Sequence, residues 1–401
     1  MTPPAAAIEI LRRGTVDFIE EADLVRKIAR GPLTVKVGFD PSAPDIHLGH
    51  TVVLRKMRHF QDAGHRVVFV VGDFTGMIGD PSGKKATRPQ LTRAEVEANA
   101  KTYTTQAFRI LDEKKTAIEF NSRWLSPLGA EGFIRLASKI TVARILERDD
   151  FQKRWTARQP IALHELFYPL AQGYDSVALK ADVELGGTDQ LFNLLVGRDL
   201  MREEGLEPQV VMTLPLLVGT DGVEKMSKSL GNAIGIQEPP AEIYGKLMSI
   251  PDRLLWSYYE LLTDVPAGKI AERRNAIEAG KENPRNVKAD LARLVTAQFH
   301  GADAAARAEE DFRKAFTKGE VPEEIETTEL PAAEPSAARV LVAARLAASM
   351  REARRKIAEG ALSVYDAAEP RVVRDPEERL DTSRAATLRL GRRFRRIVWK
   401  A

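Results

Sequence analysis

Along the first 225 residues, short runs rich in β-branched side chains alternate with segments whose apolar residues recur at helical spacing. Residues 34–39 and 66–72 each predict a strand, since valines and a phenylalanine fill a short run that reaches glycine at or near its end. Between them, apolar residues from Leu48 to Phe60 follow the period of a helix, and Gly64 supplies a stop. We therefore predict a strand–helix–strand unit with a right-handed, parallel connection.

The alternation continues beyond this unit. Residues 177–183 and 210–218 predict two more strands, separated by a helix over about residues 188–204. Residues 92–165 are mostly polar and helical in pattern, which indicates an insertion between two halves of an open sheet. The predicted fold class is α/β, with a Rossmann-like, doubly wound parallel sheet and a helical insertion.

The pattern changes after Gly231 and stays helical to about Phe316. A segment rich in Pro and Glu follows and predicts an extended linker. The last part of the chain begins with a basic helical stretch and finishes in short β-like runs, typical of a small α+β module. The predicted organisation is a Rossmann-like domain at 1–231 with its insertion at about 92–165, a helical domain at 232–318, a linker at 319–335 and the small module at 336–401.

Charge is distributed unevenly between these parts. The whole chain has 60 basic and 57 acidic residues, a net charge of +3. Residues 336–401 hold 16 basic and 8 acidic residues, so this tail carries +8 and residues 1–335 carry −5. A basic module on an acidic body favours a polyanionic partner for the tail.

Composition excludes several other classes of protein. The sequence has no cysteine, which rules out disulfides, thiolate zinc sites and a cysteine nucleophile. The first residues lack a basic segment followed by an apolar core, so they do not predict a secretory signal. No uncharged apolar run approaches the ~18 residues that a membrane helix needs. We expect a cytoplasmic protein without a membrane partner.

Residues 38–50 leave the first predicted strand, turn through two prolines and enter a helix near His47. A helix N-terminus suits an anion such as phosphate. His47 and His50 are three residues apart and project from one face, where they could donate hydrogen bonds to a reacting phosphorus centre. Gly49 leaves room for a flat ring against the backbone. For the two histidines alone, ordinary buried side chains are the commoner explanation and zinc a weaker one; with Asp40 just before them, phosphate binding is favoured.

A second element follows the strand predicted at 210–218. Residues 225–229 have the sequence Lys-Met-Ser-Lys-Ser, and two ammonium groups three residues apart on such a loop can follow a pyrophosphate as charge develops on it. Taken alone, a loop of lysines and serines is usually a solvated turn. Its occurrence downstream of the His47 element makes the phosphate interpretation much stronger.

A polar stripe is predicted on a helix between these two elements. Tyr168, Gln172 and Asp175 are spaced four and three residues apart and therefore share a helical face. A polar stripe within an apolar stretch is costly to bury unless it lines a pocket for a polar ligand. The alternative is an exposed amphipathic face.

Taken together, these segments resemble a known family. Residues 47–50 and 225–229 are similar to the two signature motifs of class I aminoacyl-tRNA synthetases. With the stripe and with residues 72–84 and 186–190, the chain resembles the bacterial tyrosyl-tRNA synthetases that carry an intact KMSKS motif, over essentially its whole length. The resemblance implies activation of L-tyrosine by ATP with Mg²⁺ and transfer to tRNA(Tyr). It also implies a catalytic role for residues 1–231, an anticodon-binding role for residues 232–318, and a homodimer whose interface includes the inserted helices.

The resemblance also implies roles for individual residues. Six polar residues would bind tyrosine: Asp40, Asp80, Tyr168, Gln172, Asp175 and Gln190. Among them, Asp175 would accept from the phenol, while Asp80, Tyr168 and Gln172 would hold the ammonium group. ATP would be bound by Asp40, Ser42, His47, Gly49, His50 and Lys228. The catalytic set would be His47, His50, Lys84, Arg88, Lys225 and Lys228, and no residue is expected to bind a metal directly.

One position departs from the family pattern. Family members of the best-known bacterial type have a tyrosine that shares the phenol contact, two residues before the Gly-Phe-Asp segment. Here that residue is Lys36, so the second phenol partner stays open.

The basic tail resembles the small αL-type RNA-binding module found in this family. A Ser-capped basic helix is followed by Gly360 and a strand. The turn lacks the usual Gly-x-Val-x-Val-Asn-Gly, and a merely solvated basic tail is the alternative. The residues expected to meet RNA phosphates are Arg351, Arg354, Arg355, Arg392 and Arg393.

Three other functions remain to be separated from tyrosine–tRNA ligation. A tryptophanyl-tRNA synthetase would lack the Tyr168 stripe and the RNA-binding tail. A nucleotidyltransferase sharing the histidine motif would need neither the Lys-Met-Ser-Lys-Ser loop nor the RNA module. A non-catalytic RNA-binding protein would have little reason to carry both phosphate elements.

Overall fold

The computed structural model describes residues 4–41, 45–82, 92–314, 325–332, 336–365, 370–391 and 393–400. Of the residues expected to act in the site or on RNA, Ser42, Lys84, Arg88 and Arg392 lie outside this described part. The chain divides into two compact units, residues 1–302 and 303–401. Each unit is described by itself below.

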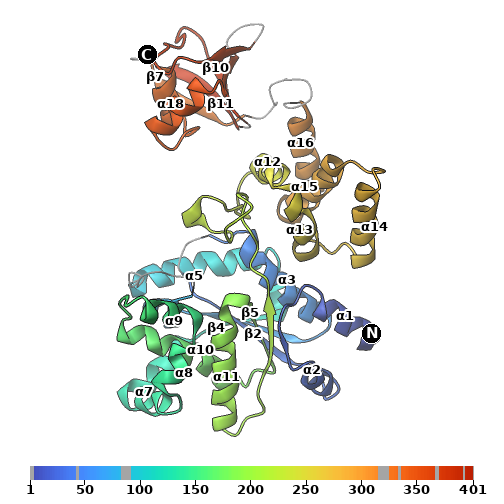
Figure 1. The fold of residues 1–401 in the computed structure, drawn as a ribbon, viewed down its shortest axis with the longest axis vertical. Helices are drawn as coiled ribbons and strands as arrows, with labels where there is room; N and C mark the ends of the chain where they lie inside the picture. Colours follow the sequence, from blue (N-terminus) through green and yellow to red (C-terminus); the bar gives the residue numbers. More distant parts are fainter. Residues whose placement is uncertain are drawn as a thin grey trace. The chain divides into compact units, whose positions relative to one another are not determined.

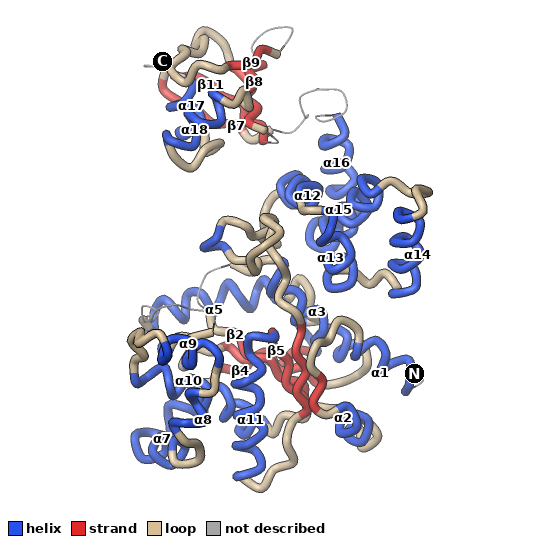
Figure 2. The backbone as a smooth tube through the Cα atoms, viewed as in Figure 1, coloured by secondary structure: helices blue, strands red, loops and turns tan. Residues whose placement is uncertain are grey.

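The first unit is built on a six-stranded sheet of order β1-β6-β5-β2-β3-β4. All neighbouring pairs are parallel except β1 with β6. Figure 2 shows these strands as one block with helices packed around it. The strands are β1 (Phe18–Ile19), β2 (Thr34–Phe39), β3 (Arg66–Val71), β4 (Thr116–Phe120), β5 (Val183–Gly187) and β6 (Val210–Leu214).

β3, β5 and β6 are buried almost without alternation because helices cover both faces of a parallel sheet. Five consecutive residues of β3 are buried, from Val67 to Val71. Helix α3 packs beside β3 and buries Val52, Met57 and Phe60 at helical spacing, as its sequence predicts. The helices before β5 are α1 (Pro4–Arg12), α2 (Glu21–Ile28), α3 (Leu48–Asp62), α4 (Thr75–Ile78), α5 (Arg93–Ala107), α6 (Ser122–Leu125), α7 (Gly129–Ala137), α8 (Val142–Leu146), α9 (Asp149–Thr156) and α10 (Tyr168–Leu179).

Two helices in the middle of the chain approach each other unusually closely. α10 packs against α11 (Leu191–Glu203), and a Cβ added at Gly173 would lie 3.0 Å from the backbone nitrogen of Gly197. Glycine at both positions therefore lets the backbones meet. This contact holds the polar face of α10 at the edge of the cleft described below.

The doubly wound sheet is confirmed, but two predicted elements are corrected. The strand predicted at residues 177–183 is wrong, because α10 continues to Leu179, ends on the left-handed Lys180, and β5 starts only at Val183. Residues 177–179 are apolar but partly exposed, and such a short apolar run has the composition of either a helix end or a strand, so the pattern did not separate them. The inserted segment 92–165 is not purely helical either, since it contains β4, which extends the sheet beside β3.

Helices follow the second signature loop, as the pattern predicts. They are α12 (Pro240–Ser249), α13 (Leu255–Leu262), α14 (Ala267–Glu278), α15 (Pro284–His300) and α16 (Ala302–Arg313) (Figure 1). α12, α13, α14 and α15 belong to the first unit, and the division between the units falls at the start of α16. Among the described residues, no helix combines the length and apolarity that crossing a bilayer requires.

The second unit contains a five-stranded sheet of order β7-β11-β10-β8-β9. Leu341, Ile357, Leu388 and Ile397 are fully buried in its core. Part of the segment expected to be a linker forms β7, which pairs with β11 in parallel. The elements are β7 (Thr327–Pro331), α17 (Ala337–Ala343), α18 (Met350–Ala358), β8 (Leu362–Tyr365), β9 (Arg371–Val373), β10 (Ala386–Leu390) and β11 (Arg393–Lys400).

Candidate active site

A cleft of about 610 Å³ lies where the strands β2, β3 and β5 end. The chain winds from β2 to one side through β3 and β4 and to the other through β5 and β6, so β2 and β5 flank the switch point at which such sheets bind ligands. Residues from sequence segments more than 180 positions apart, from Asp40 to Lys228, therefore line the same cleft. The expected residues that line the cleft are Asp40, His47, Gly49, His50, Asp80, Tyr168, Gln172, Asp175, Gln190, Lys225 and Lys228.

The two histidines form the N-terminus of α3. His47 is the N-cap, and its Nδ1 accepts from the backbone N–H of Gly49 at 3.1 Å, while Nδ1 of His50 accepts from the N–H of His47 at 3.2 Å. A neutral ring that accepts at Nδ1 carries its proton on Nε2. Each histidine is therefore a donor through Nε2.

Both histidines are neutral in the folded protein. Burial, followed by the charges of His50 and Lys228, lowers the pKa of His47 to about 2. Burial and Lys228 likewise lower the pKa of His50 to about 4. These side chains can donate hydrogen bonds to phosphate oxygens but do not contribute positive charge at neutral pH.

Two glycines that line the cleft, Gly49 and Gly72, leave no room for a side chain. A Cβ at Gly49 would lie 2.9 Å from the His47 ring, and one at Gly72 would lie 2.0 Å from Oδ1 of Asp40. Both distances are shorter than side chains tolerate, so a methyl group at either position would push a site residue aside. At Gly49 the missing side chain makes room for the ring of His47, and the binding of a flat ligand ring there stays a prediction.

The lysines of the second motif are held by carboxylates. Nζ of Lys225 lies 3.2 Å from Oδ2 of Asp189, and Lys228 pairs with Asp45. All four side chains are partly exposed, so these pairs are weak and solvent-screened. An arriving polyphosphate can therefore take over both ammonium groups at low cost.

One buried asparagine pins the loop that carries these lysines. Oδ1 of Asn232 accepts from the backbone N–H of Ser227 at 2.7 Å. Its Nδ2 donates to Oδ2 of Asp221 at 2.6 Å and to the backbone oxygen of Lys225 at 3.2 Å. Asn232 is 3% exposed, so it acts as an internal anchor for an otherwise polar loop.

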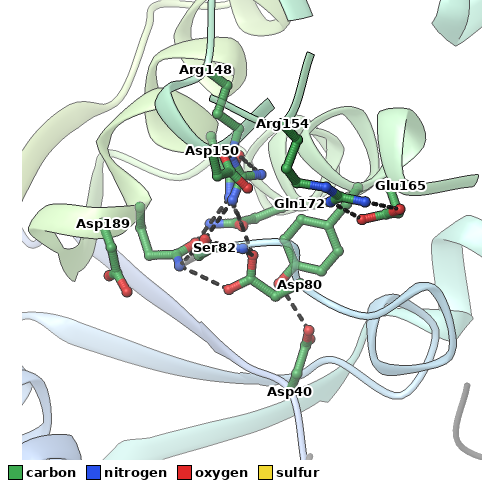
Figure 3. A network of polar contacts seen from close by, with 12 residues as sticks. Asp40, Asp80, Ser82, Arg148, Asp150, Arg154, Glu165, Gln172 and Asp189 are labelled. Carbon is green, nitrogen blue, oxygen red and sulfur yellow. Dashed lines mark hydrogen bonds and ion pairs between the residues drawn. The ribbon is translucent and has the colours of Figure 1, made fainter. Parts of the chain in front are cut away.

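A network of polar groups surrounds Asp80 (Figure 3). Oδ1 of Asp80 accepts from the backbone N–H and hydroxyl of Ser82 at 2.8 and 2.6 Å, and from Arg148 at 3.3 Å. Oδ2 accepts from Gln190 at 2.9 Å. Although burial opposes ionisation, the Arg148 charge and these donors together lower the pKa of Asp80. The carboxylate is therefore anionic and suited to an ammonium group.

The network continues to the stripe on α10. Nδ2 of Asn193 donates to Oε1 of Gln172 and to Oε1 of Gln190, each at 2.9 Å. Oδ1 of Asn193 accepts from Arg148 at 3.0 Å. These bonds fix which way the amide of Gln172 faces.

Asp175 lies at the far end of the stripe, 2% exposed. Its carboxylate accepts from the indole N–H of Trp124 at 2.8 Å and from Asn121 at 3.4 Å. Burial raises the pKa of Asp175 to about 7, against the opposing charge of Lys36. Such a carboxylate is a strong acceptor for a hydroxyl group at the closed end of a pocket.

Several residues that build this site carry no signal in the sequence. Arg148 stands between two short helices of the insertion, and Trp124, Asn121 and Asn193 belong to no recognisable motif. They act only because the fold brings them to Asp80 and Asp175. Buried donors aimed at a carboxylate become visible once the fold is known.

In the second unit, Arg351, Arg354 and Arg355 are exposed on α18, and Arg393 opens β11. Ser349 caps α18 as predicted, accepting from the backbone N–H of Glu352, and Gly360 follows the helix in the left-handed conformation, with φ of +75°. Arg354 lies 3.0 Å from Glu377, and Arg355 lies 2.9 Å from Glu359. These surface pairs leave the guanidinium groups accessible.

Comparison with known proteins gives a consistent result. The family model described as class I tRNA synthetases (W and Y) matches residues 28–317. A tyrosine–tRNA ligase of Oleidesulfovibrio alaskensis is 52% identical, over 98% of each chain. That of Haemophilus influenzae is 55% identical, over 91% of this chain and 90% of its own. Among solved structures, a tyrosyl-tRNA synthetase complexed with L-tyrosine from Archaeoglobus fulgidus shares the fold, with a TM-score of 0.63, 20% identity, and coverage of 77% of this chain and 100% of its own.

Proposed function

This chain belongs to the bacterial class I tyrosyl-tRNA synthetases, and from that premise we propose how its cleft divides the work of the reaction. The reaction is the charging of tRNA with tyrosine. The main support for the proposal is that three elements line one cleft: the polar stripe on α10 and the two candidate phosphate-binding elements at His47 and Lys225. This supports a site in which tyrosine and ATP bind side by side.

In this proposal, the stripe and the Asp80 network bind tyrosine. Asp80 is anionic and hydrogen-bonded in place, so it would hold the ammonium group together with Gln172 and Tyr168. Asp175 would accept from the phenolic hydroxyl at the closed end. Phenylalanine would leave that buried carboxylate without this partner, a difference that favours tyrosine strongly without an editing site; the handling of phenylalanine by this enzyme family is a known example.

ATP would lie along the start of α3. Nε2 of His47 and of His50 would donate to the phosphates, and the base or ribose would lie against Gly49. Asp40 and Gln190 would place the ribose and the reacting carboxylate. The roles expected for Ser42, Lys84 and Arg88 also stay proposals and concern residues outside the described part.

The first step needs little acid–base chemistry. The carboxylate of tyrosine attacks the α-phosphorus of ATP, a new P–O bond forms, and the bond to the β-phosphate oxygen breaks to release pyrophosphate. Lys225 and Lys228 would leave Asp189 and Asp45 to meet the charge that develops on the leaving group. Positioning and charge stabilisation supply the rate enhancement.

Mg²⁺ would accompany ATP by neutralising the phosphate oxygens. Among the described residues, no group of three His, Asp or Glu side chains is arranged to hold a metal ion. This donor set fits an ion bound chiefly through substrate phosphates and water, as is usual for Mg²⁺.

In the second step, the tyrosyl group passes to the terminal adenosine of tRNA(Tyr). The second unit, with its exposed Arg351, Arg354, Arg355 and Arg393, would hold the RNA backbone, and helices α12 to α16 would meet the anticodon arm. The proposed assembly is a homodimer through the inserted helices, which expose Ile134, Val142 and Trp155. The proposed location is the cytoplasm, where ATP and tRNA meet.

Pyrophosphate exchange with each of the twenty amino acids tests this proposal. We expect tyrosine alone to drive rapid exchange, and Lys228→Ala to reduce the rate about 100-fold or more because a transition-state contact is lost. Lys246→Ala, which removes an ammonium group outside the cleft, is the matched control. Exchange driven by tryptophan, or undiminished in Lys228→Ala, would contradict the proposed roles.

A further inference from the structure

A lysine lies fully buried under the tyrosine pocket without a role in the mechanism above. Lys36 stands on β2 with 0% exposure, and its ammonium group pairs with Glu184 of β5, which is 1% exposed. Taking two charges out of water costs about as much as their attraction returns, so a buried pair is weak evidence for stability. The position of the pair under the pocket suggests a different purpose.

The pair is hydrogen-bonded to the helix that carries the pocket residues. Nζ of Lys36 lies 3.2 Å from the hydroxyl of Ser176 and 3.4 Å from the backbone oxygen of Gln172, both on α10. The same Ser176 hydroxyl donates to Oε2 of Glu184 at 2.7 Å. The contacts bracket Asp175 along the helix, so the pair fixes the turn from which the phenol acceptor projects.

The second carboxylate oxygen of Glu184, Oε2, also accepts hydrogen bonds. Nε2 of Gln209, just before β6, donates to it at 2.7 Å and to the backbone oxygen of Leu194 at 3.1 Å. Glu184 therefore has a cation on one oxygen and two neutral donors on the other. The arrangement fixes the ammonium group of Lys36 in one place between β2, β5 and α10.

Both members of the pair act on Asp175. Burial raises the pKa of Asp175, Lys36 is the strongest influence that opposes the rise, and Glu184 adds to it more weakly. Asn121 and Trp124, the neutral donors from the α6 region, also oppose the rise. The effect of Lys36 on the pKa of Asp175 is thus larger than that of Glu184, so the pair as a whole acts on Asp175 as a positive charge.

The other charged groups on the elements around α10 are engaged elsewhere. Arg198 of α11 donates to backbone oxygens of Ile19 and Gln209. Others are in ion pairs or hydrogen bonds of their own: Glu165 with Arg154, Arg123 with Glu119, Asp199 with Arg202, and Asp73 with Ser122. Glu203, at the end of α11, is exposed to solvent. Lys36 is accordingly the cation on which the charge state of Asp175 depends.

We propose that Lys36 is a specificity-positioning residue: its buried ammonium group holds the pocket face of α10 and favours the anionic form of Asp175, which accepts the phenolic hydrogen bond. This inference rests on the proposed role of Asp175. It gives the Lys36–Glu184 pair a task in selecting tyrosine over phenylalanine, although neither side chain reaches the substrate.

The test compares two variants over pH 6 to 9.5. Lys36→Met removes the cation, and Lys36→Met combined with Glu184→Gln removes both charges while keeping an amide for Ser176. Pyrophosphate exchange would measure KM for tyrosine, KM for ATP, and kcat/KM for tyrosine and for phenylalanine. Circular dichroism would verify folding.

For Lys36→Met, we expect the pH midpoint of the tyrosine KM to move upward by one unit or more. Because one pKa unit corresponds to a tenfold change, the KM at pH 7 should rise about tenfold and recover toward pH 9. The double variant should lie between Lys36→Met and the parent protein. KM for ATP should stay constant and kcat/KM for phenylalanine should not fall, so the preference for tyrosine drops about tenfold.

An unchanged midpoint, or equal losses for tyrosine and phenylalanine at every pH, would show that Lys36 only fills space and would overturn the inference. If Lys36→Met does not fold, the double variant carries the same test, because it leaves no uncompensated buried charge. Asp175→Asn distinguishes the proposed role of Asp175 from the proposed role of Lys36. If it keeps the preference for tyrosine, the role of Asp175 is wrong; if it loses the preference while the Lys36→Met midpoint stays fixed, only the role of Lys36 is wrong.

Discussion

The phenolic oxygen of Tyr168 lies 2.8 Å from Oδ2 of Asp40, to which it donates a hydrogen bond. The bond joins the first turn of α10 to the end of β2, on either side of the switch point of the sheet. Thr75 donates to the other oxygen of Asp40 at 2.6 Å. Burial and the charge of Asp40 raise the pKa of Tyr168 well above its ordinary value, so the phenol keeps its proton.

Replacing Tyr168 with phenylalanine should weaken tyrosine activation. A hydrogen bond to a charged group contributes about 1.5–3 kcal/mol, so kcat/KM for tyrosine should fall about 10- to 100-fold. Most of the effect should be in KM for tyrosine, measured by pyrophosphate exchange. Tyr174→Phe removes a hydroxyl from the same helix outside the cleft and should leave the rate unchanged. Equal effects of the two changes would contradict a special role for Tyr168.

Arg148→Met should affect tyrosine binding through Asp80. Without the guanidinium group, the pKa of Asp80 should rise, and the loss of tyrosine affinity should grow as pH falls. We expect KM for tyrosine at pH 6 to rise about tenfold, with stability lowered by about 3 kcal/mol because a buried partner is lost. Arg144→Met, which removes an exposed guanidinium group in the preceding helix, is the control. A pH-independent KM in Arg148→Met would count against this explanation.

Asn232→Ala should release the loop that carries Lys225 and Lys228. Since Asn232 contacts the loop and not the tyrosine-binding stripe, kcat for adenylate formation should fall about tenfold or more while KM for tyrosine stays constant. Asn232→Asp keeps the acceptor for Ser227 but meets Asp221 with a like charge, so it should not restore the rate. Single-turnover kinetics would separate the two parameters. A change confined to the KM for tyrosine would refute the anchoring role.

Stability should fall on acidification because His47 and His50 are buried and neutral. Their pKa values in the folded protein, about 2 and about 4, lie below the ordinary value of 6.5, so the unfolded chain takes up protons first as pH falls. Their contribution is therefore complete well above pH 6.5 and is progressively lost as pH falls from there, toward 4 for His50 and toward 2 for His47. His47→Asn keeps an N-cap acceptor and should flatten this part of the curve in chemical denaturation. Histidine proton resonances that titrate between pH 6 and 7 at these positions would disprove the assignment.

Truncation after residue 314 should separate the two steps of the reaction. The cut removes β7 together with β11, its partner strand, and so avoids leaving an unpaired edge. Pyrophosphate exchange should persist, whereas tRNA charging should weaken and lose much of its salt dependence, because the phosphate-binding arginines are gone. Arg351→Ala with Arg354→Ala should reproduce part of the loss in the full chain. A proportional loss of both activities would contradict the division of labour.

The parts of the fold that the sequence predicted well are those with strong local periodicity. The strand at residues 34–39 and the helix beginning at Leu48 match the structure closely. The misassigned strand at 177–183, by contrast, covers the partly exposed end of α10 and the start of β5, and this short apolar run has no period that separates helix from strand. β4 and β7 were missed because short strands that join existing sheets depend on partners, not on their own pattern.

The sequence by itself determined the chemistry: the spacing of His47 and His50, the Lys225–Ser229 loop and the polar face of α10 predict a phosphate site beside a polar pocket because each pattern is local. Only the tertiary structure decided how that chemistry is tuned. Lys36 and Glu184 are 148 residues apart, Arg148 and Asp80 are 68 apart, and Trp124 and Asp175 are 51 apart. Charge states in a buried site depend on such distant partners and on exclusion of water, and both arise only when the chain folds.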